Sequence, residues 1–114
     1  MNRRVVTVPN PDLRGLLAER AREFRFVAGA ERENAELAVV ERSGWLVTGD
    51  AELAGAGAGD GAERRPVPTG ALPHHAAVLA GLLRRLDPAR PGDWYALDLD
   101  GLRLRGGNGA PDLG

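Results

Sequence analysis

The sequence has no cysteine, lysine, isoleucine or glutamine among its 114 residues. Without cysteine the chain can form no disulfide, thiolate nucleophile or zinc–sulfur site, so nothing ties it to an oxidising compartment. Without lysine, all 15 basic side chains are arginine. Because GC-rich codons encode arginine, alanine, glycine and proline, the composition indicates a GC-rich, bacterial genome rather than a functional need for arginine.

The arginines do not form a basic region. They are offset by 16 acidic residues, for a net charge of −1, and the two signs are interleaved along the chain. A nucleic-acid-binding domain usually carries a basic stripe, so nucleic acid is not expected as a partner. No segment approaches the roughly 18 apolar residues of a membrane helix, and the apolar run near the N-terminus is too short for a signal peptide. We therefore expect a cytoplasmic protein without membrane association.

Aromatic residues are also scarce, at 4% of the chain, whereas 43% of the residues are hydrophobic. This balance is typical of a globular protein whose core is built from leucine, valine and alanine. The length suits a single domain, which we expect over residues 1–106. We expect a flexible Gly/Ala-rich loop at 54–65 and a disordered tail at 107–114.

Two helices are predicted from apolar residues that recur with helical spacing. Residues 3–8 alternate weakly and predict a short strand before the first helix. That helix begins at Asn10, a good cap residue, followed by Pro11 at the first helical position, and we expect it to continue to about Phe24. The second helix spans residues 73–87, with leucines on one side.

A hairpin over residues 95–105 is the clearest local signal, because Asp100-Gly101 favours a two-residue turn. On one face, four leucines should be buried together: Leu97, Leu99, Leu102 and Leu104. On the other face, Asp98 should lie opposite Arg103, with both side chains exposed.

The segment 35–49 has two interpretations. Its valines, tryptophan and leucine favour a second hairpin with a turn at 41–44, and the alternative is a helix over residues 31–42. The pairs across this turn would be Val40 with Trp45 and Ala38 with Val47. With the hairpin, the predicted order is strand, helix, two strands, helix, two strands. This is an α+β fold, with a mostly antiparallel sheet of about five strands and two helices.

Residues that could carry chemistry are few. The stretch Gly57–Ala62 matches the dinucleotide fingerprint in letters, but the prolines that follow prevent the helix that this motif requires. His74 and His75 are adjacent, so their side chains diverge by about 100° and cannot chelate as an i, i+4 pair would. We expect His75 to be packed and His74 solvated, with Ser43 as a turn residue. No catalytic residue, cofactor or metal is predicted.

Two features indicate a possible interaction surface. Arg20 falls within the apolar arc of the first helix, where it could either extend to water or reach a partner carboxylate. Ala77, Ala80, Gly81 and Arg84 lie on a side of the second helix that is separate from its leucines. Small side chains there would let a second backbone approach closely, as in a symmetric dimer.

These observations predict a small, non-enzymatic interaction domain, an adaptor or regulator that binds another protein and forms a homodimer. The alternative is a small-molecule sensor with a pocket between the helices and the sheet, near Trp45 and Trp94. An enzyme that uses His75 as a base ranks below both.

Overall fold

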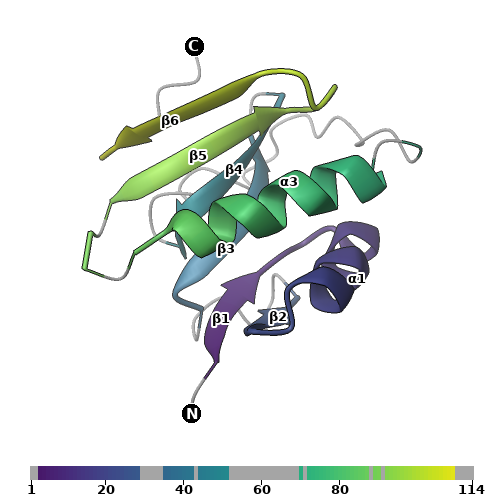
Figure 1. The fold of residues 1–114 in the computed structure, drawn as a ribbon, viewed down its shortest axis with the longest axis horizontal. Coiled ribbons are helices and arrows are strands. Elements are labelled where there is room, and N and C mark those ends of the chain that lie inside the picture. The colour runs from purple at the N-terminus through teal and green to yellow at the C-terminus, as the bar shows by residue number, and fades with distance from the viewer. Residues whose placement is uncertain are drawn as a thin grey trace.

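Within the residues that the structure describes, a six-stranded mixed sheet carries two helices on one face (Figure 1). The structure is a computed structural model, and it describes residues 3–28, 35–42, 44–51, 70, 72–87, 89–90 and 92–109. The elements are β1 (Arg4–Thr7), α1 (Pro11–Arg20), β2 (Phe24–Val27), β3 (Leu37–Arg42), β4 (Trp45–Asp50), α3 (Leu72–Arg85), β5 (Asp93–Asp98) and β6 (Leu104–Asn108). The strands lie in the order β2-β1-β3-β4-β5-β6.

The start of α1 is as the sequence predicts. Asn10 caps the helix, since its side-chain oxygen accepts hydrogen bonds from the backbone N–H groups of Asp12 and Leu13, each at 3.0 Å. These bonds satisfy two of the donors that a helix N-terminus leaves without intrahelical partners.

The end of α1 differs from the prediction. The helix ends at Arg20, and Phe24, expected in its last turn, instead begins strand β2. The segment Phe-Arg-Phe-Val suits a strand, and it pairs in parallel with β1, which places Phe24 beside Arg4 and Val27 beside Thr7. Tertiary pairing therefore overrides the helical periodicity of these residues.

This added strand changes the sheet but not the fold class, which is α+β as expected. Strand β1 pairs in parallel with both β2 and β3, whereas β3, β4, β5 and β6 are joined by antiparallel pairs. The prediction of about five mostly antiparallel strands is therefore wrong, and the sheet is mixed with six strands.

Strands β3 and β4 form the predicted hairpin rather than a helix, but with a shorter turn. Arg42 pairs with Trp45 and Val40 with Val47, so two residues connect the strands instead of four. Gly44 in this turn has a φ of +83°, a conformation that glycine adopts readily. The expected pairing of Val40 with Trp45 is wrong by two residues, which leaves both side chains on the face predicted for them.

Both faces of the sheet bury apolar side chains. Helices α1 and α3 pack together on one face, where Leu13 and Leu17 of α1 and Leu79 and Leu83 of α3 join the same core as Leu46 of β4. A second cluster lies on the opposite face and consists of Ala38, Val40, Trp45, Val47, Trp94 and Ala96. The two tryptophans are therefore on the far side of the sheet from the helices, and not beside a space between helices and sheet.

The hairpin β5–β6 has the predicted register but not the predicted burial. Leu97 pairs with Leu104, and Leu97 is buried at 3% exposure, whereas Leu102 is 85% and Leu104 51% exposed. Helix α3 packs over β4 and β5, and β6 is the strand at the edge of the sheet. The pairing of Leu97 with Leu104 was therefore correct. The two-residue turn at Asp100-Gly101 was not, because β5 ends at Asp98, the N–H of Gly101 donates to the carbonyl of Asp98 at 2.9 Å, and residues 99–103 connect the strands. The burial of four leucines together was also wrong, because the helix layer does not extend over β6.

The tail expected from residue 107 overlaps the sheet, since Gly107 and Asn108 are the last residues of β6. The expected loop at 54–65 and residues 110–114 lie outside the described residues.

The difference in burial between Leu97 and Leu102 predicts different costs of truncation. Leu97→Ala should lower the free energy of unfolding by about 2–5 kcal/mol, as removal of a buried leucine side chain does. Leu102→Ala should change it by less than about 0.5 kcal/mol, as expected for a surface position. Urea denaturation of the two variants checks this, and equal losses would contradict the observed burial.

Candidate functional site

Arg84, predicted to belong to an interaction surface, is exposed and contacts the end of α1 and the turn that follows it. Its Nε lies 2.8 Å from one carboxylate oxygen of Glu23, its Nη2 lies 3.2 Å from the other, and the same Nη2 donates to the carbonyl oxygen of Arg20 at 3.0 Å. The hydrogen bond from Arg84 lowers the pKa of Glu23 below its usual value. Arg84 is thus held against the C-terminal end of α1.

The other predicted surface residues remain on the outside. Arg20, Ala77 and Gly81 are exposed, and a Cβ built on Gly81 would meet no atom within 4 Å. Ala80, predicted to lie on the same side as Gly81, is instead buried in the core with the leucines of α3, because helical spacing turns it toward the sheet. The exposed side of α3 is therefore narrow, with small residues bordered at one end by the Arg84–Glu23 pair.

The two histidines have the predicted exposure and a shared role that the sequence did not reveal. His75 is 0% exposed, and its Nε2 lies 3.3 Å from the carbonyl oxygen of Asp98. His74 is exposed, and its Nε2 lies 3.1 Å from the carbonyl oxygen of Gly101. Both rings extend from the first turns of α3 and hold the turn between β5 and β6. The two partners are 23 and 27 residues away in the chain, so no local signal could have identified them.

The carboxylate of Asp98 accepts hydrogen bonds from the backbone of this turn. Its side chain is 15% exposed, so the prediction of an exposed carboxylate is wrong. One oxygen accepts the backbone N–H groups of Leu102 at 2.8 Å and Arg103 at 3.0 Å. Burial alone would raise the pKa of Asp98, but these N–H groups and the charge of Arg103 outweigh it and lower the pKa below its usual value of 3.8.

Gly101 is required at this turn for two reasons. Its φ of +75° is one that other residues rarely adopt. A Cβ there would also lie 2.7 Å from Cδ2 of His74. The turn, the two histidines and the aspartate therefore form one packed unit, which we call the hairpin anchor: His74, His75, Asp98 and Gly101.

Beyond the anchor, strand β6 forms an edge of the sheet. All five of its residues are exposed. The N–H of Asp98 donates to the carbonyl of Arg103, and the N–H of Gly109 donates to the carbonyl of Gly92. Because hydrogen-bonded pairs alternate in an antiparallel ladder, Leu104 and Gly106 point their backbone N–H and C=O groups away from β5.

Aromatic rings of β5 and β4 pack against residues 105–107 of this edge strand. A Cβ on Gly106 would lie 3.1 Å from the Tyr95 ring, and a Cβ on Gly107 would lie 3.0 Å from the Trp94 ring. The guanidinium of Arg105 lies 4.8 Å from the centre of the Trp45 ring, a cation–π contact.

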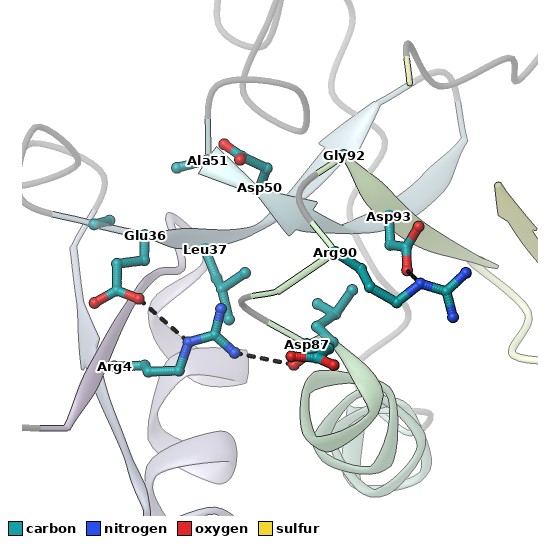
Figure 2. Close-up of a pocket in the computed structure, with 11 residues that line it drawn as sticks. Arg4, Glu36, Leu37, Asp50, Ala51, Asp87, Arg90, Gly92 and Asp93 are labelled. Atoms are coloured by element: carbon teal, nitrogen blue, oxygen red, sulfur yellow. Dashed lines mark hydrogen bonds and ion pairs between the residues drawn. The ribbon is translucent and has the colours of Figure 1, made fainter. Parts of the chain in front are cut away.

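A cavity of about 370 Å³ lies at the opposite end of the sheet, at the end of α3 (Figure 2). Its charged lining residues are Arg4, Glu36, Asp50, Asp87, Arg90 and Asp93. Figure 2 shows Arg4 extending across the cavity, where its Nε is 3.2 Å from Glu36 and its Nη1 donates to the carbonyl of Leu86 at 3.0 Å. This arrangement joins β1, β3 and α3.

The other charges that line this cavity also have partners within the chain. Arg90 lies 3.7 Å from Asp93, which in turn accepts a hydrogen bond from Asn108 at 2.8 Å. Asp87 accepts the N–H of Ala89 at 2.9 Å, and Asp50 is likewise engaged. Two arginines thus face four carboxylates in this lining, so its balance of charge is acidic, and each arginine pairs with one of the acids.

Within the described ranges, no group of three histidine, cysteine, aspartate or glutamate side chains could hold a metal ion, and no helix there is long and apolar enough to cross a membrane. Ser43 and the Gly57–Ala62 motif lie outside the described residues. Comparison with family models, curated proteins and solved structures found no match.

The carboxylate of Asp98 predicts a pH dependence of stability. Its lowered pKa means that the folded state favours the ionised form, so its contribution is full well above 3.8 and is lost as the pH falls through that value and below it. At neutral pH, Asp98→Ala should lower the free energy of unfolding by roughly 1–3 kcal/mol, because two backbone N–H groups lose a charged acceptor. Urea denaturation at several pH values checks this. The difference in free energy of unfolding between the variant and the native sequence should become smaller in acid. A difference that does not change with pH would contradict the role of Asp98.

Proposed function

We propose that this protein is a small, non-enzymatic interaction domain of the bacterial cytoplasm, an adaptor or regulator that acts by binding another protein. One observation carries the proposal. Among the residues that the structure describes, Leu102 and Leu104 are the large apolar side chains that remain exposed, and they lie together on the hairpin whose second strand is a sheet edge. Apolar side chains next to unpaired backbone groups are typical of a surface that another chain covers.

The hairpin anchor supports this proposal because it presents the leucines on a fixed support. His74 and His75 hold the turn to α3, and Asp98 closes the turn from within. A surface that is ordered before binding avoids the entropic cost of ordering it on association. The leucines thus extend from a well-packed element.

A photo-crosslinker placed at Leu102 tests the proposal in the native cells. We expect a discrete crosslinked product with another protein, which a second change, Leu104→Asp, should reduce strongly. The same crosslinker at Ala18, an exposed position on α1, is the matched control. Equal crosslinking from both positions, or none from Leu102, would argue against binding through the hairpin.

We also propose that the chain forms a homodimer, through the exposed side of α3. Ala77 and Gly81 offer an approach without bulky side chains, and the space above Gly81 is empty. A two-fold contact is the usual arrangement for two identical chains. Ala77 lies one helical turn from His74, which contacts Gly101 of the hairpin, so this side of α3 adjoins the hairpin at its N-terminal end.

Gly81→Glu should weaken this dimer, because it places a charge where two helices would meet. Light scattering across a concentration series measures the effect, with Leu102→Glu as the control that adds the same charge to the hairpin. A monomer of 12.1 kDa at high concentration would rule out the dimer. A dimer that persists in Gly81→Glu and dissociates in Leu102→Glu would place the interface on the hairpin.

A further inference from the structure

We infer that the edge of β6 binds an extended segment of the partner protein as an added strand, and that this segment alternates apolar and acidic residues. The inference rests on the proposed function, since it names the chemistry of the partner at the same hairpin. Strand addition requires backbone groups that face outward from a sheet edge, and pockets or side chains that select the residues of the added strand.

The backbone of β6 meets the first requirement. The N–H and C=O groups of Leu104 and Gly106 point away from β5, as the ladder of hydrogen bonds on either side of them shows. Edge strands are commonly protected by charged side chains, proline, a bulge or a covering segment. Strand β6 has no proline, its pairing with β5 is regular from Leu104 to Asn108, and the guanidinium of its one charged residue, Arg105, lies over the Trp45 ring.

The side chains of the hairpin define what an added strand would meet. Leu104 lies on one face, opposite Leu97, and Leu102 is exposed in the connection that precedes it. Arg103 and Arg105 lie on the other, where Arg103 is 4.0 Å from Asp98 and Arg105 lies over Trp45. Residues directly across two strands attract when their charges are opposite or when both are apolar. An added strand with apolar residues on the leucine face and acidic residues on the arginine face fits both.

A second copy of β6 fits this edge poorly. Antiparallel pairing of two copies centred on Leu104 would place Arg103 of each copy opposite Arg105 of the other. Centring on Arg105 would place the two Arg105 side chains opposite each other, and like charges directly across two strands repel. Centring on Gly106 would place Leu104 opposite Asn108, so the leucine would face a polar side chain. The edge therefore favours a different sequence over its own.

A synthetic peptide of eight residues, in which valine alternates with glutamate, is the probe for this inference. We expect it to bind the full chain, as seen by changes in the backbone amide NMR signals of β6, with slowed hydrogen exchange at Leu104 and Gly106. Binding should weaken with added salt, because the charges are exposed. A peptide in which valine alternates with lysine should bind at least about tenfold more weakly, since it places like charges opposite the arginines.

Leu104→Pro tests whether the backbone edge is used. It removes the outward N–H and the apolar side chain but no hydrogen bond to β5, so the hairpin should form and peptide affinity should fall by about tenfold or more. Circular dichroism monitors the fold. If this variant does not fold, Arg105→Glu provides the test, because it should shift the preference from the glutamate peptide toward the lysine peptide. Arg22→Glu, at an exposed position beyond α1, is the matched control and should leave the preference unchanged.

The outcomes separate strand addition from protein binding in general. No binding of the valine–glutamate peptide, or equal binding by folded Leu104→Pro, would overturn strand addition. In that case, a crosslink from Leu102 in cells would still support binding of another protein at the hairpin, but not by strand addition. A β6–β6 dimer in solution would also overturn the inference, since a second copy would occupy the edge.

Discussion

Burial of the leucine side of α3 is the interaction on which the rest of the structure depends. Leu79 and Leu83 are fully buried between α1 and the sheet. Because this side is buried, the rotation of α3 about its axis is fixed, and so are the residues that it directs toward the hairpin and toward α1. Its first turns direct His74 and His75 to the hairpin, and its last turns direct Arg84 to the end of α1. The polar contacts thus follow from an apolar one.

The surroundings of the two ends of α3 differ. Side chains at one end are paired within the chain, and the other end holds a hairpin with an exposed strand. At the C-terminal end, Arg4 and Arg84 join β1, α1 and α3 through contacts that use charged groups internally. At the N-terminal end, the helix holds the turn of a hairpin whose second strand extends beyond the helix layer. At the C-terminal end the charged groups are paired within the chain, whereas in the hairpin at the other end Leu104 keeps its side chain and its outward backbone groups exposed.

The sequence predicted those features that depend on neighbouring residues. The Asn10 cap and the register of Leu97 with Leu104 are determined within a few positions, and both are observed. Features that depend on distant parts of the chain were not predictable. Phe24 continues a helical pattern, yet it pairs with β1. Leu104 alternates as a core strand would, yet no helix extends over it, and the partners of the histidines arise only from the packing of α3.

The glycines of β6 have a different origin from most glycines in this composition. Glycine, alanine and arginine can all be encoded with G or C at every codon position, so the bias towards GC does not choose among them. At Gly106 and Gly107 a Cβ would lie 3.1 Å from the ring of Tyr95 and 3.0 Å from the ring of Trp94. Packing therefore distinguishes among these residues at the two positions where the bias in composition does not. Selection for a flat edge strand, rather than codon supply, is what would keep glycine there.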